Sequence, residues 1–111
     1  MKKLTSTLKK KIEKYLIAFG NGDKAAFEEV YRLTFDFQYL QAYLFLNDAD
    51  AAEDIVQDTF LHLYRSPESI KNVRYPYAYV KQITNNLCLD YVTKASNARE
   101  QRAEDLFFEM A

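Results

Sequence analysis

Apolar residues recur every three or four positions along most of the chain, which is the spacing of one face of an α-helix. The spacing predicts four helices, over about residues 4–19, 24–46, 51–65 and from 76 onward. The stripes expected to be buried are, in helix order, Leu4, Leu8, Ile12, Leu16 and Phe19; Phe27, Val30, Tyr31, Thr34, Phe37, Gln41 and Leu44; Ile55, Val56, Phe60 and Leu63; and Val80, Ile83, Leu87 and Tyr91.

Turn-forming residues separate the first three helices. Gly20–Gly22 predicts the end of the first, because glycine adopts the left-handed conformation of a helix C-cap at no steric cost. Asp23 is the expected N-cap of the second helix. Asn47–Asp48 predicts the next turn, and Asp50 followed by Glu53 has the spacing of a capping box that would start the third helix.

Two prolines mark the connection to the last helix. The Ser66–Pro67 pair predicts the end of the third helix, since proline disfavours helix at the residue before it. A polar connection over 66–75 has room for one helical turn, and Pro76 suits the first position of the fourth helix. Residues 94–111 contain good helix formers and no breaker, so they either continue that helix or fray. The expected fold is all-α: a compact bundle of about four helices, with or without a C-terminal helical extension.

Composition limits the class of protein. A chain of 111 residues with 49% hydrophobic residues has room for one domain with a real core. Only two glycines and two prolines argue against an all-β fold. A single cysteine excludes an internal disulfide and fits a reducing compartment. There is no apolar run of about 18 residues and no signal-peptide pattern, so a cytoplasmic protein without a membrane span is predicted.

The net charge of −1 hides a segregation along the chain. Residues 1–20 carry six lysines against one glutamate, and residues 48–64 carry five acidic residues with no lysine or arginine. Residues 65–102 are basic again, with seven lysines and arginines against three acids. The charge pattern by itself favours solvent-exposed helix faces. The alternative is a pair of neighbouring binding surfaces, one for a basic partner and one for an anionic partner. The lysines of the first helix are accordingly interpreted as the solvated side of an amphipathic helix rather than as a contact for an anionic partner.

Catalytic and metal-binding patterns fail. An EF-hand loop starting at Asp48 would need glycine and glutamate where Glu53 and Thr59 stand. His62 has one carboxylate four residues before it, which is too little for a metal site. Cys88 has no histidine partner in the pattern, and a buried thiol is its expected role. There is no glycine-rich phosphate loop, so neither enzyme activity nor a metal or cofactor is predicted.

Three motifs together point to a family. Residues 52–65, AEDIVQDTFLHLYR, resemble the AEDLVQETFLRLWR signature of extracytoplasmic-function (ECF) sigma factors. Residues 78–91, AYVKQITNNLCLDY, look like the second signature of that family, and residues 22–31, GDKAAFEEVY, are similar to the opening of the same domain. The resemblance covers roughly residues 20–95, the whole of sigma region 2. It implies a small helical domain that binds the RNA polymerase clamp and opens promoter DNA.

The resemblance gives the acidic third helix a partner. Asp54, Gln57 and Asp58 are spaced i, i+3 and i+4 and therefore share one helix face. In the family this face contacts a coiled coil on the largest polymerase subunit, whose basic residues would form charge-assisted hydrogen bonds with the carboxylates. His62 is included in the same expected contact. The alternative is a solvated face with acids favoured near a helix start; Asp58 also departs from the usual glutamate.

A second expected surface reads the minus-ten element. Single-stranded DNA is held by cations along its backbone and by aromatic rings that stack on bases. By resemblance, the 66–75 loop cradles a base flipped from the non-template strand, while Tyr79 replaces a partly buried tryptophan and is expected in the core. Gln82 and Asn85 stand where arginines are common, which predicts weaker DNA binding. The expected DNA-binding residues are Lys71, Arg74, Tyr75, Tyr77, Lys81, Gln82, Asn85 and Asn86.

The chain is thus divided into an N-terminal helix over 1–20 packed on the domain, a region 2 domain over 21–95, and an extension or linker start over 96–111. The region 4 domain that usually follows in the family has no counterpart in these residues. The apolar run at 106–108 would cap the bundle or dock elsewhere. Two alternatives stay open beside the initiation factor: a non-initiating module, either a decoy or a domain held by an anti-sigma factor, and an unrelated helical scaffold.

Overall fold

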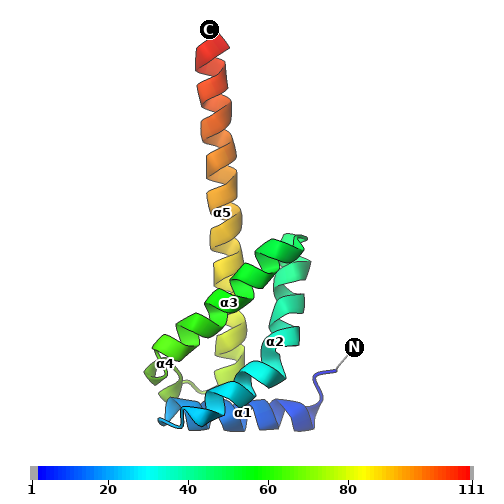
Figure 1. Cartoon of the computed structure of the whole chain (residues 1–111), viewed down its shortest axis with the longest axis vertical. Helices are drawn as coiled ribbons and strands as arrows, with labels where there is room; N and C mark the ends of the chain where they lie inside the picture. The colour runs from blue at the N-terminus through cyan, green and yellow to red at the C-terminus, as the bar shows by residue number, and fades with distance from the viewer. Residues whose placement is uncertain (1–2, 111) are drawn as a thin grey trace.

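The computed structural model describes residues 3–110, and the regular elements within them are all helices. They are α1 (Ser6–Gly20), α2 (Ala25–Leu46), α3 (Ala49–Arg65), α4 (Glu68–Lys71) and α5 (Pro76–Met110). Figure 1 shows α1 crossing the base of the molecule, α2 and α3 forming a V above it, and α5 running upward past both. The predicted all-α fold is confirmed, and α4 is the helical turn for which the 66–75 connection had room.

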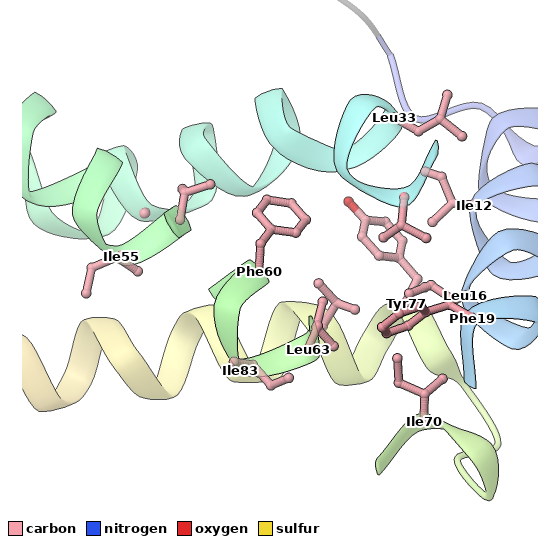
Figure 2. Close-up of a cluster of buried hydrophobic side chains, with 14 of the residues drawn as sticks. Ile12, Leu16, Phe19, Leu33, Ile55, Phe60, Leu63, Ile70, Tyr77 and Ile83 are labelled. Carbon is pink, nitrogen blue, oxygen red and sulfur yellow. The ribbon is translucent and has the colours of Figure 1, made fainter. Parts of the chain in front are cut away.

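The core lies where the helices meet above α1. Figure 2 shows Leu16 and Phe19 of α1 close to Ile70 of α4 and Tyr77 of α5, with Phe60 and Leu63 of α3 beside them. Each of these side chains is almost fully buried, and burying a large apolar side chain contributes about 1.5–3 kcal/mol. All four stripe residues predicted for α3 are in this core. The amphipathic pattern of the sequence therefore identified the central helix correctly.

The ends of α1 and the start of α2 follow local rules. The Thr5 hydroxyl oxygen accepts a hydrogen bond of 3.1 Å from the backbone N–H of Leu8 and caps α1. Gly22 takes a φ of +105°, a conformation that favours glycine. The Asp23 carboxylate accepts from the N–H of Ala25 at 3.1 Å. The glycine turn is confirmed, but Asp23 is not the N-cap of α2. The helix begins at Ala25 with Lys24 at the N-cap position, and the Asp23 carboxylate reaches its first residue from one position earlier in the chain.

The cap of α3 was assigned to the wrong residue. Asn47 ends α2 in the left-handed conformation with a φ of 53°, and this reversal leaves Asp48 extended at the start of α3. The Asp48 carboxylate, not that of Asp50, accepts the backbone N–H of Ala51 at 3.1 Å. Asp50 lies within the first turn, where its charge still favours the positive end of the helix dipole.

The ends of three predicted stripes are also wrong. Leu4 precedes α1 and is exposed, and Leu44 lies in the last turn of α2 with 73% of its surface exposed. Tyr91 is exposed because α5 makes its last fully buried contact at Cys88 and then leaves the bundle. In each of these three cases, the apolar spacing extends past the stretch that a neighbouring helix covers.

α5 continues as one helix of 35 residues to Met110. Its second half projects from the bundle in Figure 1, so the molecule measures 60 × 31 × 21 Å and its radius of gyration is 17.5 Å, against about 13 Å for a compact domain of this size. Phe107 and Phe108 near its end are exposed. The apolar run at 106–108 therefore does not cap the bundle.

Candidate functional site

The acidic face of α3 points to solvent, as the pattern predicted. Asp54, Gln57 and Asp58 are exposed, while Ile55 and Val56 between them are buried. Among residues 3–110 the salt bridges are Arg32–Glu29 and Lys94–Asp90, so neither carboxylate of this face has a cationic partner within the described chain. The face is thus available to a basic partner outside the domain.

One edge of this face adjoins a groove between α2 and α3. The Gln57 side-chain amide donates a long hydrogen bond of 3.4 Å to the hydroxyl of Tyr31. Phe27 and Tyr64 pack edge to face with ring centroids 5.2 Å apart. Together with Phe60 and Leu61 these side chains line a groove of about 240 Å³. The sequence analysis treated the aromatic residues of α2 as core, and it missed this partly exposed aromatic groove beside the polar face.

His62 lies on the other edge of the face, toward α5. It lines a hollow of about 280 Å³ together with Tyr79, Gln82 and Asn86. The residue expected to bind polymerase is therefore adjacent to residues expected to bind DNA. Sequence spacing could not show this adjacency, because it depends on how α3 and α5 pack.

The start of α5 and the connection before it present an exposed aromatic ring with cations. Tyr75 is 59% exposed, and the guanidinium carbon of Arg74 lies 5.4 Å from the centroid of its ring. Lys71 is exposed on α4, which is anchored by the buried Ile70. A cation beside an exposed ring is the combination that single-stranded nucleic acid requires.

Tyr77 was expected in the DNA-binding set, and the structure contradicts this. Only 1% of its surface is exposed. Its hydroxyl donates a hydrogen bond of 3.1 Å to the side-chain oxygen of Gln38, and burial raises the pKa of Tyr77 to about 12. Tyr77 lies three residues before the buried Val80 and seven before the buried Thr84, which is the helical spacing of an inward face. This spacing was the signal in the sequence that Tyr77 is buried. It is a better guide to the position of Tyr77 than the cations that lie near it in the sequence.

A buried polar cluster, missed by sequence reasoning, holds α5 against α2 and α3. The Gln38 amide donates to the Thr84 hydroxyl at 2.7 Å, and the hydroxyls of Thr84 and Thr59 lie 3.1 Å apart. With Tyr77 these residues join three helices. Within residues 3–110 no buried side-chain nitrogen or oxygen lacks a hydrogen-bond partner. A fully satisfied network of this kind restricts the geometry of the helices that it joins.

The outward face of α5 carries the remaining predicted DNA-binding residues. Gln82, Asn85 and Asn86 are exposed at spacings i, i+3 and i+4, so they form one amide-rich face. Lys81 is exposed, with its ammonium nitrogen 5.1 Å from the centroid of the Tyr77 ring. The structure brings these four residues together on one helix.

The described residues offer no constellation for metal or thiol chemistry. No group of three or more His, Cys, Asp or Glu side chains within 3–110 is placed to hold a metal ion. Cys88 is buried, and desolvation raises the pKa of its thiol, which disfavours the reactive thiolate. None of the helices is both long and apolar enough to cross a membrane.

These features define an all-α domain with an exposed acidic face on α3 and an exposed amide-rich face on α5, which adjoin at His62. The family model of Sigma-70 region 2 matches residues 36–99, which is more than half of the chain. The chain therefore belongs to the sigma-70 region 2 family, whose members take part in RNA polymerase binding and promoter recognition and are not enzymes. Searches of curated proteins and of solved structures gave no match.

Proposed function

We propose that this domain is region 2 of an ECF-type sigma factor that binds the clamp coiled coil of the RNA polymerase core through α3 and recognises and melts the minus-ten element through α4 and α5. The observation that carries the proposal is the bare acidic face of α3 in a sigma-70 region 2 domain. Asp54, Gln57 and Asp58 are exposed together, and charge-assisted hydrogen bonds to basic residues would satisfy both carboxylates. An activity alongside polymerase also fits the predicted cytoplasmic location.

The DNA half of the proposal rests on the exposed ring of Tyr75. A base flipped out of the non-template strand can stack on this ring, with Arg74 and Lys71 nearby for the phosphates. On α5, the amides of Gln82, Asn85 and Asn86 can donate to and accept from base edges. Melting then follows because binding favours the unpaired state of the strand.

A second candidate function is a non-initiating module that keeps the polymerase face, either as a decoy or as a domain held by an anti-sigma factor. The observation in its favour is the amide-rich face of α5, on which Lys81 is the cation beside three amides. Few cations mean few released counterions and weak DNA binding. The two functions share α3 and differ in whether the α5 surface binds promoter DNA.

The polymerase contact is tested by measuring the affinity of the whole chain for core polymerase. Asp54→Ala with Asp58→Ala should weaken binding at least tenfold, because two charge-assisted contacts are lost. The matched control is Glu28→Ala with Asp36→Ala, which removes the same charge from exposed positions of α2. Equal affinities for the two double variants would refute the assignment of the α3 face as the polymerase contact.

The DNA contact is tested with the polymerase complex of the same chain. A non-template minus-ten oligonucleotide should bind this complex more tightly than a scrambled one, and Tyr75→Ala should remove the preference because the stacking platform is lost. Binding to polymerase without any preference for the minus-ten sequence would favour the non-initiating module.

A further inference from the structure

The outer face of α1 is a basic surface that the proposed function leaves unused. Ile12 and Leu16 are buried on the inner side of this helix, while Lys9, Lys10 and Lys14 are exposed. These three lysines share the outer side of α1 with Ser6, Glu13 and Ile17. Glu13 is the acidic residue among these six, so three lysines face one carboxylate and the surface has a positive excess.

The lysines of this surface have no internal partners. The salt bridges among residues 3–110 involve α2 and α5, and none involves a lysine of α1. On a helix surface, a lysine can pair with an acid three or four residues away. Here Lys9 and Glu13 are four apart but form no salt bridge. The cations are free to bind an external anion.

α1 leads directly to the proposed DNA surface. Its last residue, Gly20, is so close to α4 that a Cβ there would lie 3.3 Å from the Ile70 side chain and 3.4 Å from the backbone nitrogen of Lys71. Figure 1 shows α1 and α4 meeting at the base of the molecule, where α5 also begins. The C-terminal end of α1 therefore adjoins α4, and the lysine face begins about 9 Å further back along the helix, because Lys14 precedes Gly20 by six residues.

We infer that the lysine face of α1 binds the sugar-phosphate backbone of double-stranded DNA flanking the melted minus-ten segment. This inference rests on the proposed function, because it requires the single strand to lie at Tyr75. Lysine is a flexible point charge suited to phosphates, and the six residues of this face include no aromatic side chain that would stack on bases. A helix of 15 residues extends about 22 Å, enough to follow several phosphates. This replaces the interpretation of α1 as merely solvated.

The backbone contact would also compensate for the amide-rich face of α5. That face has one cation beside Gln82, Asn85 and Asn86, so it contributes little counterion release. Cations on α1 would supply affinity without sequence preference, and the amides and Tyr75 would supply the preference. In this arrangement, the cations of α1 supply affinity, and the amides of α5 with Tyr75 supply sequence preference.

The experiment compares two labelled probes across a salt series, using the whole chain bound to core polymerase. One probe is the single-stranded minus-ten oligonucleotide, and the other is the same strand joined to a flanking duplex. Lys10→Gln with Lys14→Gln should leave binding of the single strand unchanged. For the duplex-tailed probe it should lower the slope of log affinity against log salt by about two, because two phosphate contacts are lost. The matched control is Arg99→Gln with Arg102→Gln, which removes the same charge from exposed positions in the projecting half of α5 that form no salt bridge within the described residues.

The outcomes separate this inference from the proposed function. A lower salt slope for the duplex-tailed probe, seen in the α1 variant and not in the control, supports the α1 contact. An unchanged slope, or an equal loss in the control, overturns the α1 contact and leaves the proposed function intact. Failure of the unmodified complex to prefer either probe over scrambled DNA refutes the DNA-binding function, and the α1 contact with it. Tighter binding of the free chain to anionic phospholipid vesicles than to the duplex-tailed probe, lost in the α1 variant, would reassign the face to a membrane surface.

Discussion

Replacing Tyr77 with phenylalanine tests the correction that moves this residue from the DNA surface to the core. Its hydroxyl is the donor to the side-chain oxygen of Gln38 in a buried cluster. Phenylalanine keeps the ring but leaves that oxygen without this donor, and an unsatisfied buried polar group costs about 1–3 kcal/mol. The free energy of unfolding at pH 7, measured by urea titration, should fall by that amount. Tyr75→Phe is the control, because Tyr75 is exposed and its hydroxyl has no partner within the described residues.

The same residue predicts a dependence of stability on pH. Burial raises the pKa of Tyr77 from 10.0 to about 12 in the folded state. Between these two values the folded state holds a proton that the unfolded state has released, so stability falls as pH rises. The contribution is fully present below pH 10, and linkage gives a loss of about 1.4 kcal/mol at pH 11 and up to about 2.7 kcal/mol at higher pH.

The measurement is the difference in unfolding free energy between the unmodified protein and Tyr77→Phe from pH 7 to pH 11. Other tyrosines and lysines titrate in both proteins, so their effects cancel in this difference. The advantage of the tyrosine should shrink by about 1.4 kcal/mol at pH 11. A difference that stays constant over this range, or an equal effect of Tyr75→Phe, would show that Tyr77 is not buried as described.

Three further substitutions test the helix cap, the polar cluster and the projecting helix. Asp48→Ala should lower the unfolding free energy by about 1 kcal/mol, because it removes the side-chain acceptor at the start of α3. Asp50→Ala should lower it by less. If urea titrations give the reverse order, Asp50 is the cap, as the sequence predicted. Thr84→Val should cost about 1–3 kcal/mol, since it removes the hydroxyl that accepts from the buried amide of α2, and a neutral effect would mean that the cluster does not stabilise the bundle. Phe107→Ser with Phe108→Ser should change the unfolding free energy by less than about 0.5 kcal/mol, because both rings are exposed; a larger loss would place the end of α5 against the bundle.

The sequence predicted features that depend on neighbouring residues in the chain. The stripe of α3, the break at Ser66–Pro67 and the start of α5 at Pro76 follow from periodicity and from the fixed geometry of proline. The exposed triplet of α3 was predictable for the same reason, since helical spacing places its members on the side opposite Ile55 and Val56. These features could be predicted because the residues that determine each of them are close together in the chain.

The features that were missed depend on contacts between helices. In the sequence, either Asp48 or Asp50 could cap α3, and the left-handed turn at Asn47 makes Asp48 the cap. Tyr77 has cations nearby in sequence, but its hydrogen bond joins it to a residue 39 positions earlier. The approach of His62 to the outer face of α5 likewise requires the packed structure. No spacing within a single helix carries this information.

The buried polar cluster has a consequence for the orientation of α5 about its own axis. Apolar side chains tolerate alternative packings of similar energy, whereas the hydrogen bonds of Gln38 with Tyr77 and Thr84 fix particular atoms opposite one another. A shift of α5 by one residue in register would turn its side chains by about 100°, which would break both bonds and carry Gln82 away from His62. The cluster therefore fixes the rotation of α5 about its own axis. We expect a bundle rebuilt with apolar residues at these positions to retain a core while losing the fixed alignment between the acidic face of α3 and the amide-rich face of α5.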